Sequence, residues 1–502
     1  LMRLVHNYMQ SASFSNGCHT NTNTRVSVST QDKTLLIYNP RVVQKSYGAE
    51  KRFFGSPPYV RLKGAGWGHS PVIFITIDDH DVTAVPKQAL KQTEFEPDGT
   101  RTFAAIEKYL YVTNTLKKKA IALKVKVETP RGESLGVFTT SQINVISKPS
   151  KKRLKLSNMN MRIDSGQRIS LNNRVPSGSS LFLMGTPTGL ATTNTFWGTF
   201  TIHIHNPDAL DDTQVHPNCI RYNMEVVIKC DLTQAVSQVY VIRKVEKRVV
   251  DSNTDGNDPV SQLQKIVLYA KGSTRMYLTA SNPRVVLQQS RMATDSSEEV
   301  SDQSIWTIAS ADVKEFTFCD SLISAQTDST SVPIDPVPHV RQVQFVVTMA
   351  NTMELRGENF TKDLQIWFNN VAAETVYQSS THIQCGPPPI SKFFSPSEEP
   401  QSKTVRIMMV RNDGVIYHTR FAYTYDPMSE NSTNQAILNL THLPLGLQSS
   451  LLSQPILSQQ QHQPLQPLNY MQPQQQPQPQ PQPLPLSLPQ PLPQPQQQHL
   501  QY

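Results

Sequence analysis

Short apolar segments, in which apolar residues are continuous or alternate with polar ones, dominate the first 427 residues. Turn-forming residues separate these segments, which are rich in β-branched and aromatic residues, as β-strands are. Apolar residues at helical spacing are nearly absent, and only LMRLVHNYM at 1–9 predicts a helix. The predicted strands are TLLIYN, VIFITI, IALKVKVE, FTIHIHN, MEVVIKCDL, QVYVIRKV, KIVLYA, RMYLTA, SIWTIAS, VQFVVTM, LQIWFN and TVRIMMV.

This pattern predicts an all-β body, and its length favours several sandwich or barrel units. Three prolines, Pro333, Pro336 and Pro338, mark a boundary before the last unit. That unit is about 90 residues long, a size typical of an immunoglobulin-like sandwich.

The end of the chain has a different composition. No Asp, Glu, Lys or Arg occurs after Glu430, and 31 of the 48 residues from Pro455 onward are Gln or Pro. Such a segment cannot bury enough apolar surface to offset its chain entropy, so we expect it to be disordered with polyproline character. Its composition fits either an inert spacer or a transcriptional interaction tail.

Overall composition indicates an anionic partner. The chain has 502 residues and a formal net charge of +8, and nucleic acid is a common partner of such basic proteins. Its five cysteines form no CxxC pair and no metal-ligand spacing. Their odd number and wide spacing favour a reduced intracellular compartment. No apolar run reaches the length of a membrane span and no signal peptide is visible, so we expect no membrane association.

Motifs for catalysis or cofactor binding are weak. The segment KGAGWGH at 63–69 lacks the spacing of a phosphate loop and predicts a turn after a strand. The segment IDDHD at 77–81 gathers possible metal ligands, but a solvated loop is the commoner meaning of such a short cluster. G-x-S-x-G, H-E-x-x-H and the P-loop are absent. We therefore expect a protein that is not an enzyme and that has no metal or cofactor.

Basic clusters are a stronger signal. ISKPSKKRLK at 146–155 is held extended by its proline, so its charges do not form one face of a long helix. It fits phosphate contact, a nuclear import signal, or both. Lys117, Lys118 and Lys119 form a second cluster before the alternating LKVKVE, where a solvated strand face explains the charges equally well.

The segment QKSYGAEKRFFGSPP at 44–58 places charge beside aromatic residues. Phe53 and Phe54 are suited to anchor a loop against a sandwich, so that the polar side chains project from a rigid base. An arginine held in this way can bond guanine O6 and N7 in the major groove, and a nearby glutamate can orient it or accept from a cytosine amine. Lysines and a tyrosine hydroxyl suit phosphates. A surface loop with a structural ion pair, Glu50 with Lys51 or Arg52, fits the spacing as well.

The segment VVQKSYGAEKRFFGSPPYVRLKGAGW resembles the CSL family, also called the Suppressor of Hairless or recombination signal binding protein J-kappa family. The resemblance continues along the body and ends near Pro427. It is carried further by GVF…INVISKPSKKR, WGTFTIHI, VIRKVEKR, DPVSQLQKIVLYAKGSTRMYL, SIWTIASADVKEFTF, LRGENFTKDLQIWFNNVAAETVY and VRNDGVIYHTRFAYTY.

The resemblance implies four parts. Residues 1–153 would form a Rel-like N-terminal DNA-binding sandwich with a basic linker, 154–334 a β-trefoil, 335–427 an immunoglobulin-like Rel C-terminal domain, and 428–502 a disordered tail. Family members bind double-stranded DNA at a GTGGGAA-type element in the nucleus. There they repress with corepressors, or activate with the Notch intracellular domain and a Mastermind-type coactivator. The same resemblance implies a monomer on DNA.

The family's DNA-contacting residues carry over with a mixed result, and the loop of the first domain matches throughout. Arg52 would be the base-reading arginine, and His6 stands where the family has an arginine near DNA, beside the matching Asn7 and Tyr8. Further matches are Gln44, Lys45, Ser46, Tyr47, Gly48, Glu50, Lys51, Phe53 and Phe54, and Lys148, Lys151 and Lys152 of the linker.

The DNA-facing hairpin of the trefoil matches in part. Arg174 and Ser177 agree with the family pattern N-R-L-R-S-Q, whereas Pro176 replaces its second arginine and Gly178 its glutamine. The changes remove side chains expected at the minor groove, although Gly178 lets the backbone approach closely.

The family's partner groove is the most altered site. Its four positions correspond to Thr213, Val215, Val236 and Leu287, where the family has Phe, Val, Ala and Gln. Only Val215 agrees. The chain is therefore identified as a divergent member, either a DNA-binding switch of Notch signalling, or an interaction scaffold or Notch-independent regulator with altered partners.

Overall fold

A computed structural model provides the three-dimensional structure of the chain. It describes residues 1–14, 32–67, 71–77, 89–105, 110–113, 117–149, 161–174, 180–206, 217–251, 258–319, 334–346, 351–393, 402–425 and 440–442. Almost all regular structure in these segments is β-strand, which confirms the all-β prediction. No helix in them is both long and apolar enough to cross a membrane.

The first part contains a short helix and strands that form a sandwich. Strand β8 shows why its sequence forms a half-buried strand: in LKVKVE the leucine and valines are buried while Lys124 is exposed. The elements are α1 (Met2–Phe14), β1 (Lys33–Pro40), β2 (Val42–Gln44), β3 (Tyr59–Lys63), η1 (Ala65–Trp67), β4 (Val72–Ile77), β5 (Lys91–Phe95), β6 (Arg101–Ala104), β7 (Ala120–Ile121), β8 (Leu123–Glu128), β9 (Ser134–Thr139) and β10 (Ile143–Ile146).

The middle part consists of short antiparallel strands around its own core, in which Trp306 and Phe200 are completely buried. Its elements are β11 (Gln167–Asn173), β12 (Leu181–Thr186), β13 (Gly189–Thr193), β14 (Phe200–Ile204), β15 (Glu225–Cys230), β16 (Tyr240–Lys244), β17 (Val249–Asp251), β18 (Gln264–Ala270), β19 (Met276–Ser281), β20 (Arg284–Gln289), β21 (Arg291–Thr294), β22 (Ser297–Glu299), η3 (Asp302–Ser304) and β23 (Trp306–Cys319).

The last part has two facing sheets. One has the order β24-β25-β29-β28, and β26, β27, β30, β31 and β32 belong to the other. The elements are β24 (His339–Phe345), β25 (Met353–Glu358), β26 (Leu364–Phe368), β27 (Val371–Ala372), β28 (Glu374–Ser379), β29 (His382–Gly386), η4 (Ile390–Lys392), β30 (Lys403–Arg411), β31 (Ile416–Tyr425) and β32 (Leu440–His442).

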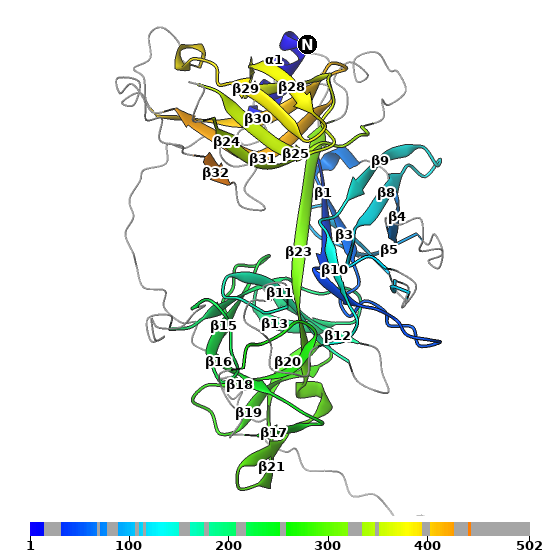
Figure 1. The fold of residues 1–502 in the computed structure, drawn as a ribbon, viewed down its shortest axis with the longest axis vertical. Helices are drawn as coiled ribbons and strands as arrows, with labels where there is room; N and C mark the ends of the chain where they lie inside the picture. The colour runs from blue at the N-terminus through cyan, green and yellow to red at the C-terminus, as the bar shows by residue number, and fades with distance from the viewer. Residues whose placement is uncertain are drawn as a thin grey trace, which may run out of the picture. The chain divides into compact units, whose positions relative to one another are not determined.

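Strand β23 joins all three parts, and Figure 1 shows it as one long arrow. Its first residues pair with β11 and β18 of the middle part. Residues 311–318 pair with β1, and 317–319 pair with β31 of the last part. The predicted limits at 153, 334 and 427 stay predictions. Strand β23 lies within the predicted trefoil range 154–334, yet it also pairs with β1 of the first part and β31 of the last part.

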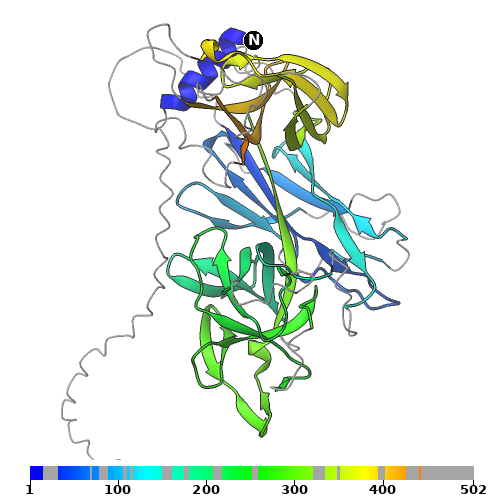
Figure 2. The same ribbon diagram turned by 60° about the vertical axis from the view of Figure 1, so that its left-hand side comes forward.

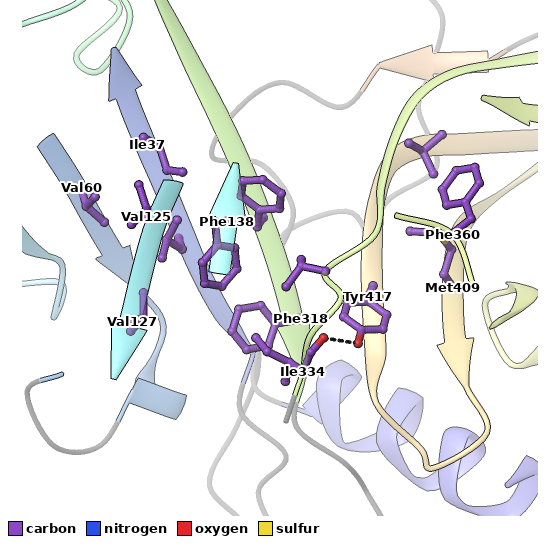
Figure 3. Packing of buried hydrophobic residues seen from close by; sticks show 14 of the residues in the cluster. Ile37, Val60, Val125, Val127, Phe138, Phe318, Ile334, Phe360, Met409 and Tyr417 are labelled. Atoms are coloured by element: carbon purple, nitrogen blue, oxygen red, sulfur yellow. Dashed lines mark hydrogen bonds between the residues drawn. The ribbon is translucent and has the colours of Figure 1, made fainter. Parts of the chain in front are cut away.

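The core of the first part continues into the last part along β23. Phe318 of β23 lies against Phe138, with ring centroids 5.9 Å apart, in one buried cluster with Ile334 and Tyr417 (Figure 3). The Tyr417 hydroxyl donates a hydrogen bond of 2.6 Å to the carbonyl of Ile334, drawn as a dashed line in the figure. The buried tyrosine therefore keeps a partner for its hydroxyl, as a buried polar group requires.

Helix α1 packs against the last part, as Figure 2 shows from a second direction. Val5 and Tyr8 are buried in one cluster with Trp367 and Met408. The Tyr8 hydroxyl donates to Asp32 and lies 2.8 Å from Nε2 of His418. The predicted helix at 1–9 is confirmed. Its apolar face packs on residues far away in the sequence, Trp367 and Met408, which the local pattern could not indicate.

One expectation about the tail is corrected. Residues 440–442, inside the segment predicted to be disordered, form β32 and pair with β31, with Phe421 opposite His442. The local sequence LNLT at 438–441 alternates apolar and polar residues, and this part of β31 offers an edge that β23 does not use. The Gln/Pro-rich remainder lies outside the described residues.

Lys314 on β23 is a buried cation. Its side chain is 5% exposed, and its Nζ lies 3.3 Å from Oε2 of Glu358. Burial, with the positive charge of Arg341, lowers the pKa of Lys314 to about 8. Below that pKa the folded protein carries a desolvated charge, which lowers the free energy of unfolding. This loss of stability diminishes as the pH rises from the folded pKa towards the pKa of the unfolded chain.

We expect the stability of the wild type to rise relative to that of Lys314→Met as the pH rises. Between pH 7 and 9.5 the difference in free energy of unfolding should change by about 2 kcal/mol in favour of the wild type, because one unit of pKa corresponds to about 1.4 kcal/mol. Urea unfolding at both pH values measures it, with exposed Lys124→Met as the control. A difference that does not vary with pH would contradict a lowered pKa.

Deletion of the tail should have two separable effects. Removing residues 450–502 should leave Tm and DNA affinity unchanged, because this uncharged segment has no cationic contact and too little apolar surface for a core. Removing 428–502 also removes β32 and should lower Tm by about 1–3 °C, since only one short strand pairing is lost. Differential scanning calorimetry checks both, and a large loss for the shorter deletion would show that the Gln/Pro-rich segment packs on the body.

Candidate nucleic-acid interface

The charged segment after β2 forms a closed loop, here called the basic loop (residues 45–52). The amide of Glu50 donates to the carbonyl of Tyr47 at 3.0 Å, and Gly48 between them has a φ of +55°. Glycine takes up this left-handed conformation without a steric penalty. The amide of Arg52 donates to Oγ of Ser46 at 2.9 Å. These bonds fix the backbone that carries the charged side chains.

Arg52 is held between two neighbours. Its Nη2 lies 3.1 Å from Oε2 of Glu50, and its guanidinium carbon lies 5.2 Å from the centroid of the Tyr47 ring. The hydrogen bond from Arg52 and its positive charge lower the pKa of Glu50, so the carboxylate stays ionised beside it. The structure shows the Glu50–Arg52 ion pair, which fits both an arginine oriented for base reading and a purely structural ion pair, so the orienting role stays a prediction. A guanidinium has five N–H donors, so others remain to meet a base edge.

The two phenylalanines anchor the basic loop as predicted. Phe54 is 6% exposed within the core, and Phe53 meets Tyr111 edge to face with centroids 5.7 Å apart. Tyr111 also lies 5.2 Å from Nζ of Lys51. Sequence reasoning missed Tyr111, because its short segment YLYV lacks the length of the other strand signals.

Arg174 brings the middle part into the same site. It follows directly after β11, and its charge contributes to the lowered pKa of Glu50 after the larger effects of Arg52. A second observation places the two parts together: Ser56 and Ser170 of β11 share a buried hydrogen bond of 2.7 Å. The basic loop and Arg174 therefore form one positively charged site.

A completely buried tryptophan fixes this arrangement. Nε1 of Trp197, from the middle part, donates to the carbonyl of Pro57 at 2.7 Å, and the Tyr59 hydroxyl donates to the carbonyl of Trp197 at the same distance. The Tyr59 ring stacks on Tyr38 with centroids 4.4 Å apart. This contact joins β1 and β3 to the middle part a few residues beyond the basic loop.

The other predicted DNA-binding residues differ in what they present. Tyr47, Lys51 and Lys148 are exposed and Lys45 is half-buried. Ser46 is 5% exposed and braces Arg52, so it acts on the position of the arginine, and its contact with DNA stays a prediction. Lys151, Lys152 and Ser177 lie outside the described residues.

The N-terminal match and the weaker motifs have simpler outcomes. His6 and Asn7 are exposed on α1, whereas Tyr8 is 2% exposed. Gly64 begins the turn predicted after β3 and has a φ of +96°, and a Cβ there would lie 2.2 Å from the carbonyl oxygen of Asp32. The acidic segment 78–81 lies outside the described residues. Among the residues that the structure describes, no group of three metal-ligating side chains occurs.

Two of the four predicted groove positions are described. Val236 is 40% exposed and forms a bridge with Lys229 beside β15, and Leu287 on β20 is 36% exposed. Val286 next to it is 43% exposed. These apolar side chains face solvent and are available to a partner, although Thr213 and Val215 lie outside the described residues.

Comparison with known proteins identifies the three parts. The LAG1 DNA-binding family model matches residues 35–160, the Beta-trefoil DNA-binding domain matches 187–306, and the TIG domain matches 337–425. The Recombining binding protein suppressor of hairless-like protein of Homo sapiens is 32% identical over 422 residues, covering 79% of this chain and 80% of that protein. The chain belongs to the Suppressor of Hairless family. It is a DNA-binding regulator of transcription with a β-trefoil and an immunoglobulin-like TIG domain.

Two further relatives agree with this assignment. The Mus musculus protein of the same name is also 32% identical over 422 residues, with the same coverage. Transcription factor cbf11 of Schizosaccharomyces pombe is 26% identical over 256 residues, covering 49% of this chain and 40% of that protein. The basic loop lies inside the LAG1 match and the groove positions inside the trefoil match, whereas Arg174 lies between the two matched segments.

Proposed function

We propose that this member of the Suppressor of Hairless family recognises a GTGGGAA-type element in duplex DNA through its basic loop. The main support is the fixed position of Arg52, between an ionised Glu50 and the ring of Tyr47. An arginine that is already oriented loses less conformational entropy when its fork meets O6 and N7 of guanine. Arg52 is the base-reading residue in this proposal, and Glu50 and Ser46 position it.

The remaining basic residues bind the backbone of the duplex. Phosphate contacts fix the register of a protein on DNA and carry no base information themselves. We assign this role to Lys45, Tyr47, Lys51, Lys148, Lys151, Lys152, Arg174 and Ser177. Arg174 is well placed for it, because the buried Ser56–Ser170 contact holds the middle part beside the basic loop.

The cellular role that we propose follows from the family. The protein acts in the nucleus, without catalysis and as a monomer on DNA, and links corepressors or coactivators to the element. The Notch intracellular domain and a Mastermind-type coactivator are the activating partners that the resemblance implies. A regulator independent of Notch is the second candidate, and the altered groove side chains Val236 and Leu287 favour it.

Base reading predicts a specific effect of Arg52→Ala. It should weaken binding to the element by about 1–3 kcal/mol and reduce discrimination against a scrambled duplex, because a bidentate guanine contact is lost. Lys148→Gln is the matched phosphate variant: it should weaken binding to both duplexes equally and lower the salt dependence by about one unit. Fluorescence anisotropy measures both. If Arg52→Ala weakened both duplexes equally, its role would be phosphate contact.

The altered groove should weaken binding of a Notch-type peptide. Such peptides press a tryptophan onto the trefoil, and Thr213 replaces a phenylalanine that this ring could pack on, a contact worth about 0.5–1.5 kcal/mol. Leu287 replaces a glutamine that could form a hydrogen bond with the peptide. Val236 replaces a smaller alanine and so narrows the groove. Together these changes should weaken the peptide at least about tenfold, or about 1.4 kcal/mol.

Restoring the family side chains tests this prediction. The triple variant Thr213→Phe, Val236→Ala, Leu287→Gln should bind the peptide more tightly than the wild type in calorimetric titration. Both described side chains are at least 36% exposed, so their replacement should leave the core intact. Equal affinity of the wild type and the triple variant would show that neighbouring residues already compensate for the changes.

A further inference from the structure

A three-stranded sheet in the first part ends beside the basic loop. Its order is β2-β10-β7. Strand β10 is parallel to β2, with Ile146 opposite Gln44, and antiparallel to β7, with Asn144 opposite Ala120. The carboxyl ends of β2 and β10 and the amino end of β7 therefore lie at the same edge of the sheet.

Each strand carries lysines at that edge. Lys45 follows β2, Lys148 follows β10 by two residues, and Lys117, Lys118 and Lys119 precede β7. The backbone is held at these points, since the amide of Lys45 donates to Ile146 at 2.9 Å and the amide of Val145 donates to Lys119 at 2.8 Å. Neighbouring strands lie about 4.8 Å apart, so the three lysines begin about 10 Å from the strand that leads into the basic loop.

This position separates the lysines from the alternating strand that follows. On β8 the exposed Lys124 belongs to the outer face, and Lys126 pairs with Glu128 at 2.7 Å. Lys117, Lys118 and Lys119 are exposed one after another, before any strand begins, so alternation does not explain them. Consecutive exposed cations at a sheet edge suit the evenly spaced phosphates of a nucleic-acid strand.

We propose that Lys117, Lys118 and Lys119 extend the phosphate-binding surface of the basic loop, and that they contact the sugar-phosphate backbone of DNA flanking the element. The surface continues from Lys45 through Lys148 to these three lysines. This inference rests on the proposed function, because the basic loop must lie on DNA for the edge to reach it. The contact is independent of sequence and sensitive to salt.

The test uses the full chain with Lys117, Lys118 and Lys119 changed to Gln. Binding is measured against salt concentration on three duplexes: the element alone, the element with added flanking base pairs on both sides, and a scrambled duplex of the longer length. The wild type should bind the longer element duplex more tightly than the short one. The variant should lose that gain, and its salt slope should fall by about 2–3 units, since each lost phosphate contact lowers the slope by about 0.9.

The variant should keep the ratio of affinities for element and scrambled DNA. Lys124→Gln is the control for losing an exposed lysine away from the edge, and it should change neither quantity. An unchanged salt slope, or an equal gain from flanking DNA in the variant, overturns the inference while leaving base reading intact. A wild type that does not distinguish the element from the scrambled duplex overturns the proposed function, and the inference with it.

Discussion

The hydrogen bonding of β23 is the constraint on which the other contacts depend. Its 14 residues pair with the middle part, then with β1, then with β31, without interruption. Phe316 and Phe318 of the same strand are buried in the core that the first and last parts share. A change in the path of β23 would therefore disturb strand pairing in all three parts together, and the position of each part follows from its pairing with this strand.

The candidate site uses that constraint. The site that we propose combines Arg52 from the first part with Arg174 from the middle part, and neither part alone supplies both. Trp197 and the Ser56–Ser170 pair join the first and middle parts through buried hydrogen bonds. Leaving any of these buried polar groups without a partner would be costly. Hydrogen bonds within the basic loop fix its own backbone. The junction and β23 fix its position relative to the middle part.

Sequence patterns predicted the all-β class, the helix at 1–9 and the anchoring of the basic loop by Phe53 and Phe54. These features depend on local periodicity and on residue types within a few positions. Three features depend on pairing between distant segments: the reach of β23, the burial of Tyr8 beside His418, and the pairing of residues 440–442 with β31. A single sequence carries no record of such register, so Tyr111 and the common edge of β2, β10 and β7 appeared only in three dimensions.

Strand β23 also limits how the parts can influence one another. Successive residues of a strand point to opposite faces, so a slip of one residue would move Phe316 and Phe318 out of their buried cluster and put the carboxylate of Glu315 in the place of a phenylalanine. Intermediate registers are therefore not available to it. A partner that drew β31 away from β23 would therefore have to release the pairing at residues 317–319 as one block.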